Sequence, residues 1–449
     1  MNRRFYLENL GCAKNQVDAE IMIAALERGG WDRTDDPASA TAILVNTCGF
    51  IGPAKQESID VTLAYLDSCP DARVVMTGCL SQRYPDDLAS EMPELSGVFG
   101  NRAPARIVEL LEQALERGTD ATDGPIVLAP TTGPGVALES SPRSQLLSLP
   151  GSAYVKVAEG CDNRCAFCAI PLIRGRARSK PVESVLGEID ALLARGIREI
   201  NLVAQDLASY GRDLPDAGPQ ELLRSISSRP GRFWVRLLYV YPEHFPDSFF
   251  PILRSDPRLL PYFDVPFQHA SARVLRRMGR PGSAESYLKL VRTIRSELPD
   301  AVVRSTLLVG FFGEGEDDFD ELLAFQRQAD LDWLGVFPYS PEDGTPAMRG
   351  NPPLDVSPAV AAERASLVER RQRKITHARM ERFVGRELDV LVEELVPHEP
   401  LAIGRCYAQA PDVDGSVVIN ARRGSLTPGT FVRCRIVRRN GLDLEAAAL

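Results

Sequence analysis

Three cysteines near the middle of the chain are spaced as metal ligands. Cys161, Cys165 and Cys168 follow a C-x3-C-x2-C pattern, with no fourth cysteine and no histidine close by. Thiolates at such spacing bind soft metals, either tetrahedral zinc or an iron-sulfur cluster. A structural zinc site takes four protein ligands, whereas a 4Fe-4S cube held by three cysteines keeps one iron free for a substrate or cofactor. The pattern therefore favours an open cluster that takes part in chemistry, and a structural zinc knuckle is the less favoured alternative.

Three further cysteines are far apart in the sequence but occupy the same kind of position. Cys12, Cys48 and Cys79 each follow a short apolar run that predicts a β-strand, and each has a glycine beside it. Because the carboxyl ends of parallel strands share one rim of a doubly wound sheet, the three thiols can converge on one metal. The glycines would let the backbone approach a bulky cluster. The alternative is that each is a buried small hydrophobe, a frequent fate of free cysteine, but three matching placements favour a second metal centre.

The composition limits the class of protein. The chain has 449 residues, of which 44% are apolar, enough for about three domains with buried cores. It contains neither a signal-like leader nor an uninterrupted apolar run of about 18 residues, so we expect a cytoplasmic protein without membrane contact. In that compartment an odd count of nine cysteines favours metal ligation over disulfides, and Cys69, Cys406 and Cys434 are expected to be ordinary core or surface residues. The formal charge of -9 argues against broad binding to nucleic acid and suits a basic partner.

The segments that would position the cysteines alternate between strand and helix patterns. Residues 1–118 alternate in this way, which predicts an N-terminal doubly wound parallel sheet. Residues 119–150 are rich in Gly, Pro, Ser and Thr without periodicity, which predicts a linker. The expected strands of the first part are 5–7, 42–45 and 73–76, and its first expected helix is 18–26.

The rest of the chain predicts two more units. Residues 151–380 contain six strand and helix repeats, which predict a partial (β/α)6 barrel, smaller than the closed eight-unit form. Residues 381–449 contain short strand-like runs between Gly and Pro, which predict a small antiparallel β barrel. The chain as a whole is expected to be an α/β protein. The expected strands are 153–157, 199–203, 233–238, 262–266, 302–309, 333–338, 387–392, 417–419 and 431–437, and the helices include 182–195, 287–298 and 317–328.

The motifs together resemble those of the radical S-adenosylmethionine (SAM) methylthiotransferase family. The C-x3-C-x2-C run with Phe167 before its last cysteine is similar to the radical SAM signature, residues 159–179 match the family's central motif, and residues 306–314 look like its later strand-and-glycine motif. The resemblance covers essentially the whole chain and implies a radical SAM barrel and a C-terminal TRAM barrel. It also implies two 4Fe-4S clusters, one on Cys161, Cys165 and Cys168, which binds SAM through its open iron, and one on Cys12, Cys48 and Cys79.

Within the family, the chain is most similar to the branch that modifies an aspartate of ribosomal protein uS12. The resemblance rests on Gln205-Asp206 with Tyr210-Gly211 and on residues 265–271 and 404–415. Residues 384–449 hold nine Asp or Glu against eight Arg, close to neutral where a barrel that grips RNA should be basic. A basic ribosomal protein would suit this surface better. The alternatives are a tRNA (adenosine) methylthiotransferase and, from another class, a non-catalytic iron-sulfur or zinc protein that binds RNA.

The resemblance implies that sulfur and a methyl group are added at the β carbon of that aspartate. No side-chain acid, base or nucleophile breaks such a C–H bond, so radical chemistry of the cofactor is required. The implied partners are uS12 and a reductant such as flavodoxin or ferredoxin, and the ribosome would allow contact with nucleic acid. The implied SAM contacts are Phe167, Gln205, Asp206, Arg304 and Gly310, with Gln268 or His269 as a further candidate.

Several of these residues also have structural interpretations. Asp206 alone could be a helix cap, and a lone histidine such as His269 is more often simply hydrogen-bonded. Arg174, Arg176 and Arg178 either face substrate or an acidic surface, or form an ordinary solvated charge run.

Overall fold

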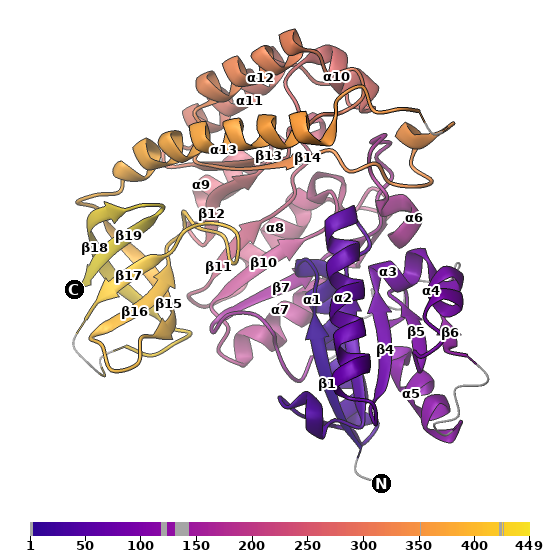
Figure 1. Ribbon diagram of the computed structural model, residues 1–449. Coiled ribbons are helices and arrows are strands. Elements are labelled where there is room, and N and C mark those ends of the chain that lie inside the picture. The colour runs from indigo at the N-terminus through magenta and orange to yellow at the C-terminus, as the bar shows by residue number, and fades with distance from the viewer. Residues whose placement is uncertain (1–2, 118–123, 131–142, 351, 422–423, 425) are drawn as a thin grey trace.

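A computed structural model describes residues 3–117, 124–130, 143–350, 352–421, 424 and 426–449 (Figure 1). It contains two parallel sheets of six strands each, a closed five-stranded barrel and a two-stranded sheet. No helix within these residues is long and apolar enough to cross a membrane.

The first sheet is parallel throughout and has the order β2-β1-β3-β4-β5-β6. Its strands are β1 (Arg4–Asn9), β2 (Asp32–Arg33), β3 (Ala42–Thr47), β4 (Arg73–Gly78), β5 (Gly97–Gly100) and β6 (Ile126–Leu128). Every residue of β3 is buried, and its side chains alternate between two cores, Leu44 facing one and Ile43 the other. A strand buried on both sides reads as a continuous apolar run, which is why the sequence revealed it.

Helices cover both faces of this sheet, so the predicted doubly wound arrangement is confirmed. The first core contains side chains of α1 (Ala13–Arg28) and α5 (Ile107–Glu116). The second contains side chains of α2 (Gly52–Ser68), α3 (Cys79–Arg83) and α4 (Pro85–Glu91). Strand β6 lies in the stretch predicted as a linker over residues 119–150 and extends the sheet beyond residue 118. The rest of that stretch lies partly outside the described residues.

The second sheet is an open, parallel sheet with the order β14-β13-β12-β11-β10-β7, which confirms the partial barrel. Its outer face packs against helices in one large core. The strands are β7 (Ser152–Lys156), β10 (Glu199–Val203), β11 (Trp234–Leu237), β12 (Leu259–Asp264), β13 (Val302–Val309) and β14 (Trp333–Pro338). The helices are α6 (Ile170–Arg174), α7 (Val182–Ala194), α8 (Pro219–Ser227), α9 (Phe249–Ser255), α10 (Ala272–Arg277), α11 (Ala284–Glu297), α12 (Glu316–Ala329) and α13 (Pro358–Glu381).

The C-terminal barrel is closed in the order β15-β16-β17-β19-β18. Its strands are β15 (Glu387–Leu395), β16 (Leu401–Arg405), β17 (Val417–Asn420), β18 (Phe431–Asn440) and β19 (Asp443–Ala448). The barrel was predicted, but β16 and β19 were not, and the pair β17–β19 is parallel where an antiparallel barrel was expected. The other neighbouring pairs are antiparallel.

The barrel packs against the inner face of the open sheet (Figure 1). Trp234 of β11 lies 4.5 Å from Phe431 of β18, measured between ring centroids. Glu199 of β10 binds two guanidinium groups, with Oε1 2.9 Å from Arg236 Nη2 and Oε2 2.6 Å from Arg405 Nη2. All three side chains are buried, so an ionic contact joins the two units.

Replacing Glu199 by glutamine is expected to destabilise this junction by about 3–5 kcal/mol, because buried guanidinium groups lose their anion. Burial opposes ionisation of Glu199, but Arg405 and Arg236 outweigh it and lower the pKa of this carboxyl from 4.5 to about 2. A lowered folded-state pKa stabilises the fold above pH 4.5, and this stabilisation is lost as the pH falls towards 2. Urea unfolding followed by tryptophan fluorescence should therefore show a smaller loss of stability over that pH range in Glu199→Gln than in the wild type.

The matched control is Glu387→Gln, because Glu387 pairs with Arg435 on the exposed side of the barrel. This variant is expected to unfold like the wild type. Equal urea midpoints for Glu199→Gln and Glu387→Gln at neutral pH would contradict the role of Glu199.

Candidate functional site

The three N-terminal cysteines lie at the carboxyl ends of adjacent strands. Cys12 precedes α1 and follows β1, Cys48 follows β3, and Cys79 begins α3 directly after β4. Strands β1, β3 and β4 are neighbours in the sheet, so the cysteines share one rim. The thiols are close enough to interact electrostatically, Cys48 with both Cys12 and Cys79. The structure therefore brings this trio together, and its role as a cluster ligand set stays a prediction.

Two of the glycines beside these cysteines, Gly49 and Gly78, have a structural role that was not predicted. A Cβ atom on Gly49 would lie 2.7 Å from the backbone of Cys79, and one on Gly78 would lie 2.7 Å from Thr47 O. Gly78 also has a φ of +94°, a conformation that side chains other than glycine rarely adopt. These glycines let the Cys48 and Cys79 loops approach each other closely.

Asn15 ties the three loops together. Its Nδ2 donates to the carbonyl oxygen of Thr47 at 2.7 Å, directly before Cys48. The Cys79 thiol donates to Asn15 Oδ1 at 3.0 Å, and Asn15 itself lies in the first turn of the helix that follows Cys12. One buried side chain thus fixes the spacing of the trio.

The central trio lies in a loop that is held at both ends. The loop runs from the small antiparallel sheet of β8 (Ala158–Glu159) and β9 (Arg178–Ser179) to α6. Cys161 N–H donates to Gly175 O at 3.1 Å, and Ala166 N–H donates to Met278 O at 2.8 Å. A Cβ atom on Gly160 would lie 2.1 Å from Arg176 O, so only glycine permits this approach. The three thiols interact electrostatically with one another, as in the first trio.

The donor set of both trios fits iron-sulfur clusters. Burial raises the pKa of the Cys48 thiol to about 12 and that of the Cys161 thiol to about 11, so ligation by iron would release their protons. In the part of the chain that the structure covers, no three His, Cys, Asp or Glu side chains are close enough to hold one metal ion. A cube places each thiolate on a different iron, which requires wider spacing than a single ion does.

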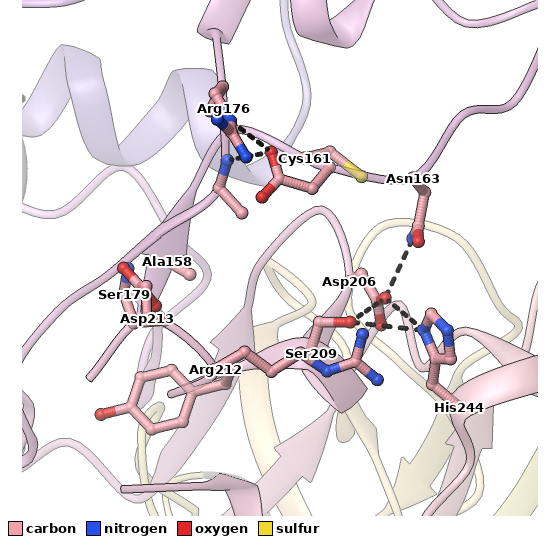
Figure 2. Close-up of a pocket in the computed structure, with 14 residues that line it drawn as sticks. Ala158, Cys161, Asn163, Arg176, Ser179, Asp206, Ser209, Arg212, Asp213 and His244 are labelled. Carbon is pink, nitrogen blue, oxygen red and sulfur yellow. Dashed lines mark hydrogen bonds and ion pairs between the residues drawn. The ribbon is translucent and has the colours of Figure 1, made fainter. Parts of the chain in front are cut away.

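A cavity of about 490 Å³ borders the central trio beside Cys161 (Figure 2). Asp206 lines it and accepts hydrogen bonds from Asn163 Nδ2 at 2.9 Å and Ser209 Oγ at 2.6 Å. Its other oxygen accepts from Ala208 N–H at 3.0 Å and caps the short helix Leu207–Ser209. Asp206 therefore anchors the cysteine loop and is also a helix cap.

The other predicted SAM contacts lie in different surroundings. Gln205 Nε2 donates to Glu159 Oε1 at 3.1 Å, and Arg304 is ion-paired with Asp264 at 3.0 Å. Phe167 meets the ring of Phe311 edge-on at 6.4 Å between centroids. These positions do not test a contact with SAM, so the assigned roles stay predictions.

Gly310 and His269 have structural explanations. A Cβ atom on Gly310 would lie 2.5 Å from Cβ of Ala361 in α13, so the helix requires glycine here. His269 is fully buried, and its Nδ1 accepts a hydrogen bond from Ser271 N–H at 3.0 Å. Its neighbour Gln268 has a φ of +69°, a strained backbone at the end of a barrel strand.

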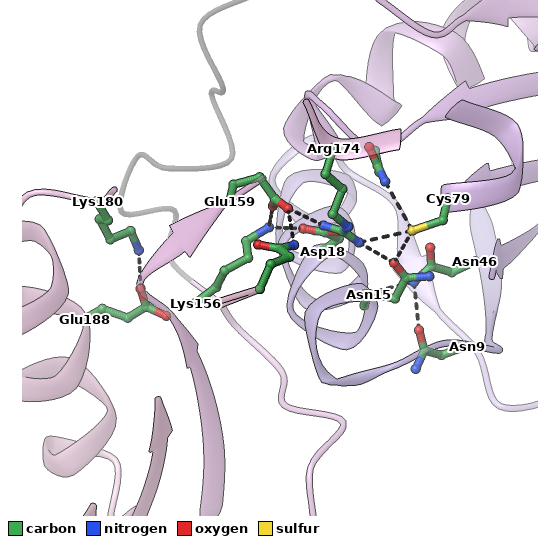
Figure 3. A network of polar contacts seen from close by, with 12 residues as sticks. Asn9, Asn15, Asp18, Asn46, Cys79, Lys156, Glu159, Arg174, Lys180 and Glu188 are labelled. Carbon is green, nitrogen blue, oxygen red and sulfur yellow. Dashed lines mark hydrogen bonds and ion pairs between the residues drawn. The ribbon is translucent and has the colours of Figure 1, made fainter. Parts of the chain in front are cut away.

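Arg174 links the two trios through a buried ionic network (Figure 3). Its Nη2 donates to Cys79 Sγ at 3.3 Å, and its Nη1 lies 2.8 Å from Glu159 Oε1 and 3.0 Å from Asp18 Oδ2. Glu159 comes two residues before Cys161, and Lys156 also binds both carboxylates. The side chain of Arg174 is 1% exposed, so the interpretation as a solvated charge run is wrong for this residue, and a contact with substrate stays a prediction.

Replacing Arg174 by methionine is expected to lower the free energy of unfolding by about 3–5 kcal/mol, because Asp18 and Glu159 lose a buried cation. Arg176→Met is the matched control, since the Arg176 side chain is 90% exposed. Chemical unfolding of samples with equal iron content compares the two. Indistinguishable midpoints would contradict the proposed importance of the network.

Asn15, Asp18, Lys156 and Glu159 were not identified from the sequence as site residues. The sequence of α1 contained a signal, because its polar residues alternate with apolar ones. In the structure every residue from Lys14 to Leu26 is buried. The helix lies between the first sheet and the open second sheet. Ala19 and Met22 are in the core of the first sheet, and Val17 and Ile21 are in another core. Polar residues on a helix buried all round need partners, which indicates a site.

Comparison with known families matches three parts of the chain. Residues 4–100 match the uncharacterized protein family UPF0004, residues 155–325 the radical SAM superfamily, and residues 384–449 the TRAM domain.

Full-length relatives share one name. The chain is 40% identical to the ribosomal protein uS12 methylthiotransferase RimO of Treponema denticola, over 98% of this chain and 99% of that protein. It is 42% identical to the protein of the same name from Geobacter sulfurreducens, over 97% and 96%. With the one from Desulforudis audaxviator it shares 43% identity, over 99% and 97%.

Solved structures show the same fold at low identity. The radical SAM methyltransferase TsrM of Kitasatospora setae, with cobalamin and a [4Fe-4S] cluster bound, superposes with a TM-score of 0.55 at 18% identity, over 76% of this chain and 74% of that one. The cobalamin-dependent radical SAM enzyme OxsB superposes with a TM-score of 0.52 at 14% identity, over 83% and 61%.

Proposed function

The chain belongs to the family of ribosomal protein uS12 methylthiotransferases, and from this membership we propose its substrate and the roles of its residues. It is a radical SAM enzyme that uses SAM and two 4Fe-4S clusters. We propose that it adds sulfur and a methyl group to the β carbon of an aspartate in uS12.

The observation that carries this proposal is the joint position of the two trios. Arg174 contacts the thiol of Cys79 and the carboxylate of Glu159, two residues before Cys161. A single buried side chain thus spans from one trio to the loop of the other. When bound, the cluster at Cys161, Cys165 and Cys168 would supply the hydrogen-abstracting radical from SAM, and the cluster at Cys12, Cys48 and Cys79 would present the sulfur, which is methylated by a second SAM.

The protein residues provide position and charge. Cys161, Cys165 and Cys168 would hold the cluster that binds SAM, and Cys12, Cys48 and Cys79 would hold the other. Asn15 fixes the spacing of the N-terminal trio, and Arg174 sets its position relative to the central trio. Such fixed spacing is what a reaction between two centres and one substrate carbon requires.

The surface of the C-terminal barrel supports a protein substrate over RNA. Four arginines of β18 are each paired with a carboxylate, which reduces their attraction for phosphate. The pairs are Arg433–Asp389, Arg435–Glu387, Arg438–Glu445 and Arg439–Glu381. We also propose that the enzyme meets uS12 on the ribosome in the cytoplasm, and that a one-electron donor such as flavodoxin or ferredoxin reduces the clusters.

A reaction with small ribosomal subunits tests the proposal. The reconstituted enzyme, SAM and dithionite are incubated with the subunits, and uS12 is then analysed by mass spectrometry. We expect the mass of uS12 to rise by one methylthio group in place of one hydrogen. An unchanged uS12 beside methylthiolated nucleosides in a parallel tRNA reaction would overturn the proposed substrate.

A further inference from the structure

Lys14 is a buried cation next to the first trio. It lies two residues after Cys12 in the first turn of α1, and only 7% of it is exposed. Its Nζ stands 3.3 Å from the centroid of the Tyr239 ring. It forms no ion pair with any residue that the structure describes. A buried ammonium without an anion is costly, and the face of one ring compensates it only in part.

The other buried cations of this region already have anions. Lys156 and Arg174 share the carboxylates of Asp18 and Glu159, and Arg304 binds that of Asp264. Of these four buried cations, Lys14 is therefore the one that has no carboxylate partner among the described residues.

The backbone of Tyr239, whose ring lies against Lys14, is fixed by hydrogen bonds within the radical SAM domain. Tyr239 follows β11 and has a φ of +63°, which is unusual for a bulky side chain. Its N–H donates to Asp264 Oδ2 at 3.3 Å, and its carbonyl oxygen accepts from Leu207 N–H at 2.9 Å. Strained residues that their surroundings fix in this way are frequent where a ligand is bound.

The surroundings of Lys14 place it between the two trios. It follows Cys12 at the rim of the first sheet, and its ammonium reaches the ring of Tyr239, which follows β11 of the open sheet. Burial lowers the pKa of this ammonium, whereas the Cys12 thiol, Asp264 and Glu159 raise it and Arg174 lowers it further. Glu159 leads into the Cys161 loop. An anion bound to Lys14 would thus lie between the rim of the first sheet and the carboxyl ends of the strands of the open second sheet.

We propose that Lys14 binds the side-chain carboxylate of the substrate aspartate. This inference rests on the proposed function, because it requires an aspartate as substrate. The β carbon is bonded directly to that carboxylate, so a charge-assisted hydrogen bond to Lys14 holds the reacting carbon between the two trios. The same contact selects aspartate over asparagine, whose neutral amide gives a weaker interaction with an ammonium.

Peptide binding to the reconstituted holoenzyme tests this assignment. Two fluorescent peptides from uS12 are compared under anaerobic conditions, one with the target aspartate and one with asparagine in its place. The wild type is expected to bind the aspartate peptide at least about thirtyfold more tightly. Lys14→Met is expected to bind the two alike, within about threefold, and Lys14→Arg to keep part of the preference. Lys289→Met, at an exposed position of α11, is the control and keeps the full preference.

Three outcomes would overturn the assignment. Equal binding of both peptides by the wild type would do so without any variant, and so would an undiminished aspartate preference in Lys14→Met. The iron content of Lys14→Met is expected to equal that of the wild type, and a loss of iron together with the preference would assign Lys14 to the cluster instead. If the wild type modifies tRNA and leaves uS12 unchanged, the proposed function itself fails. If it modifies uS12 but binds the aspartate and asparagine peptides equally, only the proposed role of Lys14 fails.

Discussion

Replacing Cys165 by alanine is expected to reduce the release of 5'-deoxyadenosine from SAM to background. Cys165 is the middle residue of the central trio, and its Sγ lies 3.5 Å from the hydroxyl oxygen of Tyr241 in a loop fixed at both ends. Two remaining thiols are too few to hold the cube. Iron is expected to fall from about eight to about four atoms per chain, because the N-terminal cluster remains. Chromatography of reduced reactions measures the nucleoside, and a colorimetric assay measures the iron.

The control for this experiment is Cys69→Ala. Cys69 is a partly exposed cysteine at the end of α2, away from both trios, and its replacement is expected to leave both measurements unchanged. Persistent 5'-deoxyadenosine release by Cys165→Ala would contradict the assignment of the central trio as ligands of the cluster that binds SAM.

Replacing Cys48 by alanine is expected to separate SAM cleavage from the methylthiolation of uS12. Cys48 lies at the rim of the first sheet, and its neighbours Cys12 and Cys79 cannot hold a cube alone. SAM cleavage should continue, since the central trio is intact, whereas methylthiolated uS12 should become undetectable. Both products are quantified in the same reduced reaction, with iron again near four atoms per chain.

Cys69→Ala also serves as the control here, with both products at wild-type amounts. Retained methylthiolation by Cys48→Ala would refute a role for the N-terminal trio in supplying sulfur. Loss of SAM cleavage together with methylthiolation would contradict the division of labour between the trios.

The strands that the sequence predicted best lie in the open parallel sheet. Strands β10, β13 and β14 have the predicted bounds, because each is a short run rich in β-branched or aromatic residues between helical segments. Strand β6 has three residues in a polar stretch, and it forms because β5 offers a free edge. Strand β19 contains three alanines, which favour strands weakly, and its pairing with β17 and β18 determines its conformation.

The positions of the cysteines followed from the sequence, but the residues between the two trios did not. Spacing identified the central trio, and strand ends identified the other. Arg174 sits in a run of arginines that resembles a solvated surface, yet it binds Asp18, which is 156 residues away in the sequence. Local pattern cannot reveal such a partner, because the contact depends on how α1 packs against the barrel.

A competition between the two candidate substrates tests the central claim most directly. One reaction contains the reconstituted enzyme, SAM, reductant, small ribosomal subunits and bulk tRNA, and tandem mass spectrometry locates every methylthio group. We predict one modification, at the β carbon of an aspartate in uS12, and unmodified tRNA. A methylthio group on a tRNA nucleoside with uS12 unmodified would contradict the account.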